Sequence, residues 1–320
     1  MKRLDVTEHD GRYAAHLVEC PDPRPAADEV LLRVAASGVN RADLSQIGGH
    51  YPPPPGESEI LGLEAAGTLD ATGEPVCAIL AGGGHAELVA VPRGQIVRRP
   101  RSMDALHAAA VPEAYLTAFV NLRIEAGLAG GDALLVHAGA SGVGLAAIQV
   151  GRFFGARVAA TTRTAAKRAA LGEAGAELAI DSSRENVAEA IEGRWGRDAV
   201  TVVLDPVGAG TLPEDLRVLA RGGRIIVLAT MSGAEARIDL RLLMAKRARL
   251  IGSVLRGRSR AEKALLVERF ASEVLPAFDD GRLRVLLDTV YPAGEAASAF
   301  DQMRENRNTG KIVLDWSRPG

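Results

Sequence analysis

The strongest constraint on the fold is an alternation of short apolar runs with longer helical segments, which begins near residue 130. Strands that alternate with helices pair in parallel through right-handed crossovers, with helices on both faces of the sheet. We therefore expect an α/β, doubly wound nucleotide-binding domain. The apolar runs predict strands at residues 133–136, 157–161, 178–180, 200–204, 224–228 and 250–254, and the intervening segments predict helices at 143–154, 164–174, 184–193, 213–219 and 240–247.

The first third of the chain has a different pattern, typical of a compact β-rich domain. Strands are predicted at residues 28–37, 74–80 and 85–91. Tyr51 precedes four consecutive prolines, which fix φ and remove backbone donors, so this run predicts a stiff surface loop.

The tail of the chain does not extend the alternation, so we expect it to return to the first domain. It predicts a helix at 259–275, a strand at 286–291, a helix at 294–305 and a strand at 311–316. The expected domains are therefore 1–113 with 257–320, and 114–256.

Composition excludes several classes of protein. The 38 basic and 40 acidic residues nearly cancel, so neither a nucleic acid nor an anionic membrane is an expected partner. Two cysteines, Cys20 and Cys77, are too few for a disulfide framework and are expected to be small buried residues of a cytoplasmic protein. We expect no membrane segment, because His137, Gln149 and small residues interrupt the most apolar stretch.

A glycine-rich turn follows the first strand of the alternating region. Its spacing is that of G-x-G-x-x-G, with Ser141 in the place of the second glycine. Gly139, Ser141, Gly142, Val143 and Gly144 would bring backbone amides and a helix N-terminus against a pyrophosphate. The alternative is a tight strand-to-helix connection without a ligand.

The end of the next strand favours NADPH over NADH. An NAD site usually places an acidic residue about 20 residues after the turn. Here Thr161, Arg163 and Lys167 stand in a stretch without any carboxylate, and cations suit a 2′-phosphate. The alternative is that both cations only solvate the first turn of a helix.

Five motifs in order carry a family resemblance: residues 35–43 (AASGVNRAD), 60–64 (ILGLE), 111–119 (VPEAYLTAF), 137–144 (HAGASGVG) and 308–314 (NTGKIVL). With them the chain resembles the quinone oxidoreductase (zeta-crystallin-like) branch of the medium-chain dehydrogenase/reductase superfamily, closest to the type induced by the tumour suppressor in animals. The resemblance implies a discontinuous GroES-like substrate domain with a Rossmann NADPH-binding domain inserted into it.

The resemblance also implies roles for individual residues. Asn40, Tyr51 and Thr117 would line the nicotinamide and substrate cleft. The residue types themselves suggest Tyr51, or water held by Asn40 and Asp43, as the source of a proton, and they assign no general acid firmly. Alternatively, Asn40 and Asp43 only cap a turn, and Tyr51 is a packed aromatic residue. The remaining cofactor contacts would come from the glycine turn, from Thr161, Arg163 and Lys167, and from Asp205, Leu228, Ser253, Leu255, Asn308 and Lys311.

The residues at the zinc-ligand positions of alcohol dehydrogenases favour a zinc-independent enzyme. Arg41 and Leu63 occupy two of these positions, and no cysteine lies near residues 113–117. Without a Lewis acid, acceptors that are already electrophilic are the expected substrates. We expect reduction of small quinones, with α,β-unsaturated ketones or aldehydes as an alternative and non-catalytic NADPH binding as another.

Two departures from the family pattern and one edge strand bear on these expectations. The segment between Gly67 and Ala86 is shorter than the family pattern, and Ser182 replaces a tyrosine that relatives often carry beside the adenosine phosphate. The resemblance also implies that the strand at 250–254, at the edge of its sheet, pairs with a second copy as it does in relatives, so a homodimer is expected.

Overall fold

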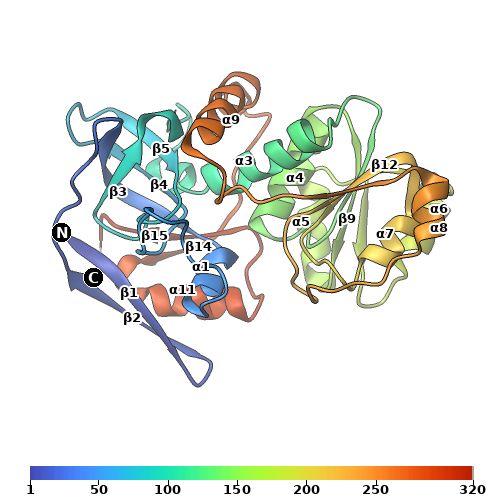
Figure 1. Cartoon of the computed structure of the whole chain (residues 1–320), viewed down its shortest axis with the longest axis horizontal. Coiled ribbons are helices and arrows are strands. Elements are labelled where there is room, and N and C mark those ends of the chain that lie inside the picture. Colours follow the sequence, from blue (N-terminus) through green and yellow to red (C-terminus); the bar gives the residue numbers. More distant parts are fainter. Residues whose placement is uncertain (319–320) are drawn as a thin grey trace. The chain divides into compact units, whose positions relative to one another are not determined.

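The computed structural model describes residues 1–318 and forms two compact units. Unit 1 comprises Met1–Leu116 and the chain from Leu255 onward, and unit 2 comprises Thr117–Val254 (Figure 1). The chain therefore leaves the first unit and returns to it.

Unit 2 is built on a six-stranded parallel sheet with the order β10-β9-β8-β11-β12-β13. This is the doubly wound arrangement predicted from the alternation, so the predicted fold class is confirmed. The strands are β8 (Ala133–Val136), β9 (Arg157–Thr162), β10 (Leu178–Asp181), β11 (Val200–Asp205), β12 (Leu219–Val227) and β13 (Arg249–Gly252).

Helices cover both faces of this sheet (Figure 1). Side chains from α6, α7 and α8 bury one face with Leu135, Val203 and Ile225, whereas α4 contacts β8 and β9. The helical elements are α3 (Pro112–Phe119), which begins in unit 1, a π-helical turn (Val120–Glu125), α4 (Gly142–Phe153), a 3-10 turn (Ala165–Lys167), α5 (Arg168–Glu173), α6 (Val187–Trp195), α7 (Leu212–Val218) and α8 (Leu240–Lys246).

Two of the predicted elements differ from the observed ones. The helix expected at 164–174 is divided into the 3-10 turn and α5. The strand expected from residue 224 begins at Leu219. Its pairing with β11 is irregular, since Val200 pairs with Leu219 but Val202 pairs with Arg224. Gly222, at φ +79°, lies within this irregularity and interrupts the sequence pattern by which the first residues of the strand would be predicted.

Unit 1 contains a seven-stranded sheet, in which six strands follow the order β14-β15-β3-β4-β5-β7 and the seventh, β6, pairs with β3. The final strand β15 pairs antiparallel with β3, with Ile312 opposite Val39, so the tail of the chain completes the first sheet. The strands are β3 (Glu29–Val39), β4 (Glu64–Leu69), β5 (Pro75–Ile79), β6 (Leu88–Pro92), β7 (Ile96–Arg98), β14 (Leu287–Pro292) and β15 (Lys311–Asp315).

Helices and turns of unit 1 pack around this sheet. Phe300 and Met303 of α11 join Leu32, Ile312 and Leu314 of the sheet in one buried core. The helices are α1 (Arg41–Ile47), α2 (Ala105–Ala108), α9 (Arg260–Glu273), α10 (Pro276–Asp279) and α11 (Ala296–Arg304), with 3-10 turns at Arg93–Gln95 and Ala293–Glu295.

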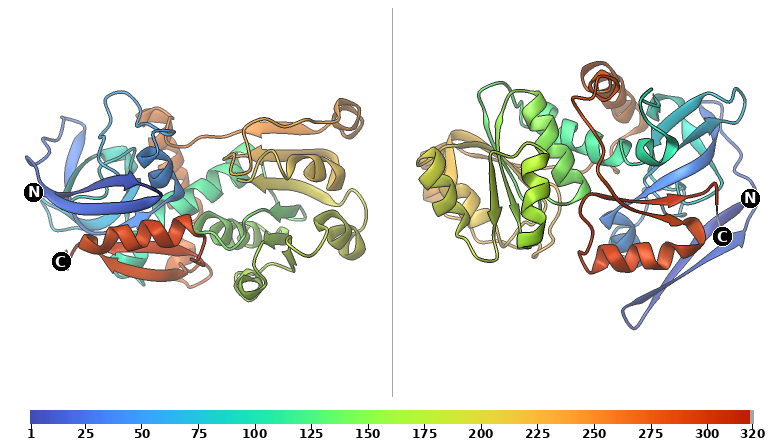
Figure 2. Two further views of the ribbon diagram at one scale, coloured as in Figure 1. Left: turned by 90° about the horizontal axis from the view of Figure 1, so that it is seen from below. Right: turned by 180° about the vertical axis from the view of Figure 1, so that it is seen from behind.

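An N-terminal hairpin, which the sequence analysis did not predict, packs against α11 (Figure 2). Strands β1 (Lys2–His9) and β2 (Arg12–Glu19) are joined by Asp10 and Gly11, both at positive φ, as a two-residue hairpin turn requires. Tyr13 contacts Phe300 with ring centroids 5.9 Å apart, which fixes the hairpin to the helix.

Within the part of the chain that the structure describes, no helix has the length and apolarity needed to cross a bilayer.

Candidate functional site

The glycine-rich turn connects β8 to α4 in the way the sequence predicts. Ser141 is the N-cap of α4, and its Oγ accepts a hydrogen bond from the Gly144 amide at 3.0 Å. A Cβ on Gly144 would lie 2.4 Å from the carbonyl oxygen of Ala138, so only glycine permits this close approach of turn and helix. The first amides of a helix have no partner within it, and here those of Gly142 and Val143 begin a twelve-residue helix. The turn therefore fits a pyrophosphate group.

Two exposed or half-exposed cations follow the neighbouring strand β9. Arg163 is exposed directly after the strand, and Lys167 ends the 3-10 turn. Thr161 is buried at the end of β9, and the hydroxyl of Ser182 donates to the Thr162 carbonyl at 3.3 Å. This is a positive surface, without a carboxylate between residues 160 and 167, at the place where a dinucleotide fold holds the adenosine ribose.

Three more of the predicted cofactor residues lie at the carboxyl ends of the parallel strands. Asp205 ends β11, and the Leu228 amide donates to its carbonyl oxygen at 3.0 Å. Ser253 follows β13 and donates its amide to Val227 at 3.0 Å. Ligands of doubly wound sheets bind at this edge.

The Asp205 side chain is already used by the protein. Its carboxylate accepts from the amides of Val207 and Gly208 and from the hydroxyl of Thr211. Asp205 therefore shapes the loop after β11 rather than offering a free carboxylate.

Beneath the glycine turn lies a buried His137–Asp215 pair that the sequence analysis did not select. Nε2 of His137 lies 2.7 Å from Asp215 Oδ1, and its Nδ1 lies 3.1 Å from the hydroxyl of Thr161. Burial raises the pKa of Asp215 to about 6, while His137 acts in the opposite direction. The pair ties β8, β9 and α7 together under the turn.

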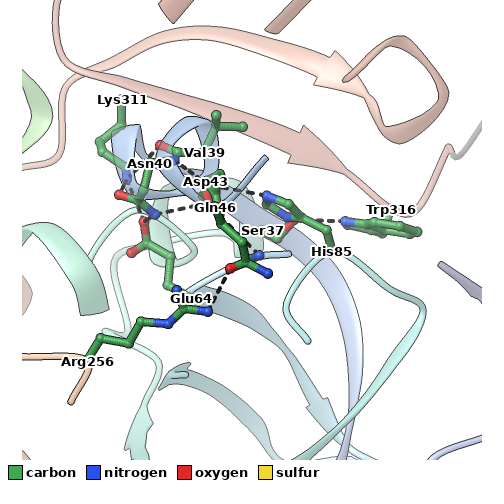
Figure 3. A network of polar contacts seen from close by, with 12 residues as sticks. Ser37, Val39, Asn40, Asp43, Gln46, Glu64, His85, Arg256, Lys311 and Trp316 are labelled. Atoms are coloured by element: carbon green, nitrogen blue, oxygen red, sulfur yellow. Dashed lines mark hydrogen bonds and ion pairs between the residues drawn. The ribbon is translucent and has the colours of Figure 1, made fainter. Parts of the chain in front are cut away.

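A buried polar network occupies the centre of unit 1 (Figure 3). The Lys311 ammonium forms an ion pair with Glu64 and donates to Asn40 Oδ1 at 2.7 Å. Asn40 Nδ2 donates to Glu64 Oε1 at 3.0 Å, and the other Glu64 oxygen accepts from the Glu113 amide at 2.8 Å. Glu64 is fully buried and Lys311 is 4% exposed, so each charge depends on the other.

The network continues through Asp43, which is also fully buried. Its carboxylate accepts from the amides of Asn40 and Gly62, at 2.7 and 3.2 Å, and lies 3.6 Å from Nε2 of His85. The first of these bonds belongs to the capping box that begins α1, so the turn-capping interpretation of Asn40 and Asp43 describes what these atoms do within the protein.

Arg256 holds the segment that carries Tyr51. Its guanidinium donates to the carbonyl oxygens of Ala81 at 2.8 Å and Tyr51 at 2.9 Å and to the side-chain oxygen of Gln46 at 2.6 Å. It also lies over the Tyr51 ring, 5.0 Å from the centroid. Arg256 is 5% exposed, so the loop that carries the half-buried Tyr51 is fixed by a desolvated cation.

Four more predicted residues take varied positions. The Asn308 amide donates to the Gly310 carbonyl at 2.8 Å, which shapes the turn before β15, and Leu255 is buried in unit 1. In unit 2 the buried Thr117 hydroxyl has no hydrogen-bond partner among the described residues.

Tyr51 keeps its proton, because burial raises the pKa of its phenol above the usual value.

Glu113 was not selected from the sequence, although it lies within one of the recognised motifs. It stands half-buried in the first turn of α3. Burial raises the pKa of its carboxyl to about 8, and the nearby Glu64 acts in the same direction, while Lys311 and Arg256 oppose it. A glutamate without a catalytic spacing pattern gives no local signal, so only the fold could identify it.

Within residues 1–318, no group of three or more acidic, histidine or cysteine side chains could hold a metal ion. At two of the positions where alcohol dehydrogenases carry zinc ligands, Arg41 donates to the Met303 carbonyl at 2.9 Å and Leu63 is buried. Cys77 is buried, whereas Cys20 is only partly buried, so the expectation of a buried residue was wrong for Cys20.

Two family models match the chain. Residues 26–83 match the alcohol dehydrogenase GroES-like domain, and residues 142–272 match the zinc-binding dehydrogenase model. The first lies in unit 1, and the second lies mainly in unit 2.

Several known proteins are similar over nearly the whole chain. A quinone oxidoreductase of Pseudomonas aeruginosa is 29% identical over 98% of this chain and 99% of its own. The solved quinone oxidoreductase of Thermus thermophilus, also determined in complex with NADPH, has a TM-score of 0.85 and is 32% identical over 98% of this chain and 100% of its own. A phenolphthiocerol/phthiocerol polyketide synthase subunit of Mycobacterium tuberculosis is 30% identical over 99% of this chain, which spans only 15% of that much longer protein.

Proposed function

We propose that this chain, which belongs to the quinone oxidoreductase-like members of the medium-chain dehydrogenase/reductase superfamily, is a reductase of small quinones. In this proposal the enzyme depends on NADPH and is independent of zinc. When bound, NADPH supplies a hydride. The observation that carries the proposal is the glycine turn, which fits a pyrophosphate and is followed by Arg163 and Lys167 without any carboxylate at the ribose position.

The proposed cofactor contacts divide by position. Gly139, Ser141, Gly142, Val143 and Gly144 would hold the pyrophosphate, and Thr161, Arg163 and Lys167 would face the 2′-phosphate. A cation beside a phosphate forms strong charge-assisted hydrogen bonds, which NADH cannot make at that position. Thr117, Leu228, Ser253 and Leu255 would pass along the remainder of the cofactor.

In unit 1 we propose that Tyr51 contacts the acceptor while Asn40 and Asp43 hold the surrounding backbone. The side-chain atoms of Asn40 are bonded to Lys311 and Glu64, and Asp43 is fully buried. Lys311 and Asn308 would support the site from beneath, because their polar atoms are bonded within the protein.

The absence of a zinc ligand set determines the class of acceptor in this proposal. Arg41 and Leu63 cannot replace a cysteine and a histidine as ligands. A quinone needs no Lewis acid, since its own conjugation stabilises the negative charge that hydride transfer creates. The residues of the chain then need mainly to orient the acceptor, and good orientation can lower a barrier by about 7–11 kcal/mol.

The test is to mix metal-stripped protein with NADPH and either 9,10-phenanthrenequinone or 1,4-benzoquinone and to follow the nicotinamide absorbance. We expect rapid loss of NADPH that a chelator leaves unchanged and that NADH does not match. Turnover of alkenals but not of quinones would instead establish the enone reductase. Tight NADPH binding without turnover of any acceptor would establish the non-catalytic alternative.

Three finer assignments also stay proposals. The exposed side chains of Leu250 and Val254 lie on or just after the edge strand β13, where we propose that a homodimer forms. Light scattering tests this assignment, which a monomer mass would remove. We also propose that the protein is cytoplasmic and of the tumour-suppressor-inducible type.

A further inference from the structure

The first turn of α3 carries a carboxyl group that the proposed function leaves without a role. Glu113 is half-buried, and its side chain makes no hydrogen bond or ion pair to another of the described residues. Its backbone amide donates to Glu64 at 2.8 Å. A carboxyl in a partly desolvated place without a partner favours its neutral form.

The groups around this carboxyl belong to several elements of unit 1. Tyr51 comes from the tetraproline loop, Arg256 from the returning chain and Lys263 from α9, and each interacts electrostatically with Glu113. Glu64, Lys311 and Asp43 interact with it from the central network. Glu113 is thus placed among one phenol, three cations and two further carboxyl groups.

The two neighbouring glutamates are in contrasting environments. Glu64 has Lys311 as an ion-pair partner and receives hydrogen bonds from Asn40 and from the Glu113 amide. Glu113 has none of these, and its pKa of about 8 keeps it protonated at neutral pH. A carboxyl group that is kept protonated at neutral pH by its surroundings is able to donate a proton.

We infer that Glu113 is the proton donor for the reduced acceptor, an assignment that rests on the quinone reductase function proposed above. The acceptor gains two electrons and one hydrogen as a hydride, whose source is oxidised to NADP⁺. The O–H bond of Glu113 breaks as an O–H bond forms at the acceptor oxygen that hydride transfer has left negatively charged, so that quinone, hydride and one proton together give the hydroquinone. The resulting carboxylate is stabilised by the helix N-terminus and by the cations Lys263, Arg256 and Lys311, and it takes its next proton from water.

Tyr51 is the competing donor, and its chemistry is less suited to the task. Burial and the neighbouring Glu113 both raise the pKa of its phenol above the ordinary value of 10. A general acid works best when its pKa is near the operating pH. Tyr51 therefore holds its proton too tightly near neutral pH, whereas Glu113 is matched to that range.

The test compares wild-type protein with Glu113→Gln, Glu113→Asp and the matched control Glu268→Gln, an exposed glutamate of α9 in the same unit. With saturating NADPH and 1,4-benzoquinone, we expect wild-type kcat to fall as pH rises through about 8. Glu113→Gln should lower kcat by about 100-fold or more and remove this pH limb. Glu113→Asp should retain part of the rate with a shifted limb, and Glu268→Gln should match the wild type.

A second readout needs neither cofactor nor turnover. Infrared difference spectra of wild-type protein against Glu113→Gln should show the carbonyl band of a protonated carboxyl that disappears as pH rises through about 8. The dissociation constant of NADPH should be the same in both proteins, which excludes misfolding as the cause of a lower kcat.

The outcomes separate the two proposals. If wild-type protein does not reduce quinones, the proposed function fails and this inference fails with it. If the wild type is active and Glu113→Gln matches it in kcat and pH profile, only the inference is overturned. A missing carboxyl band near neutral pH overturns it as well.

Discussion

Replacing Lys311 by methionine should remove one charge of a buried ion pair and leave the other behind. The Lys311 ammonium donates to the Val39 carbonyl, to Asn40 and to Glu64, which is fully buried. Methionine has a similar length, so the change isolates the charge and its hydrogen bonds from the packing of the stem.

The magnitude follows from the burial of the pair. Removing one partner of a buried ion pair costs about 3–5 kcal/mol, because the remaining charge is desolvated without compensation. For a unit of this size, each kcal/mol lowers Tm by about 2–4 °C, so we expect unit 1 to melt about 6–20 °C lower. The double variant Glu64→Gln/Lys311→Met should recover much of this loss, since neither position of the pair then carries a charge that lacks its partner.

The assay can report on unit 1 alone. The chain has two tryptophans, and Trp316 is buried in unit 1 with its indole N–H donating to Ser37 at 2.9 Å. In a Trp195→Phe background, fluorescence follows Trp316 through thermal or urea unfolding. A loss below about 1 kcal/mol for Lys311→Met, or a double variant no more stable than the single one, would refute the reasoning.

The remaining predictions concern the cofactor turn, the Tyr51 loop and Glu113. Replacing Arg163 or Lys167 by alanine should weaken NADPH binding by about 10- to 100-fold and leave NADH binding unchanged in fluorescence titrations, and equal losses for both cofactors would contradict the 2′-phosphate assignment. Gly144→Ala should destabilise unit 2 by about 1–3 kcal/mol in urea unfolding, because its Cβ would meet the Ala138 carbonyl oxygen, whereas Gly172→Ala, with nothing within 4 Å, should not destabilise it. Arg256→Lys keeps the charge but lacks the planar guanidinium that reaches three acceptors at once. It should raise the quinone KM about fivefold or more at unchanged NADPH affinity, and an unchanged KM would argue against a positioning role. Finally, the pKa of Glu113 is about 8 in the folded chain, against an ordinary value of 4.5. Between these two pH values the unfolded chain releases a proton that the folded chain keeps. The wild type therefore loses stability as pH rises through this range. Urea unfolding should therefore find Glu113→Gln and wild type nearly equal at about pH 5 and the variant more stable at about pH 8.5, and a gap independent of pH would exclude the raised pKa.

The fold of unit 2 was predictable because its strands are buried on both faces. Such strands appear in a sequence as continuous apolar runs, and the helices between them have the lengths that parallel crossovers require. The prediction was less exact at two places: β12 begins earlier than expected, at a stretch that contains Gly222, and the helix expected at 164–174 is divided into a 3-10 turn and α5. The N-terminal hairpin was missed although Asp10-Gly11 is a strong hairpin signal, because its strands mix polar and apolar residues and bury only part of one face.

The candidate site was predictable only where its chemistry is local. The glycine turn and the cations after β9 lie within about thirty residues and depend on backbone geometry that a motif encodes. The network of unit 1 instead joins Asn40 to Lys311 across 271 positions and Gln46 to Arg256 across 210. No spacing rule connects such residues, so their partnership emerges only from the fold; the contact of Lys311 with Asn40, for example, depends on the pairing of β15 with β3.

Strand register gives a reason why a buried ion pair lies among the otherwise apolar long-range contacts of unit 1. Closing a long loop costs only about 0.6 kcal/mol more for each doubling of its length, so the interruption of unit 1 by unit 2 is a modest entropic burden. The greater problem is register, because a one-residue slip of a strand exchanges its two faces. An ion pair tolerates such a slip less well than apolar contacts do, because a slip of β15 would bury Lys311 and Glu64 without partners. We therefore expect the Lys311–Glu64 pair to fix the register of the returning strand, and with it the position of the Glu113 amide that Glu64 holds.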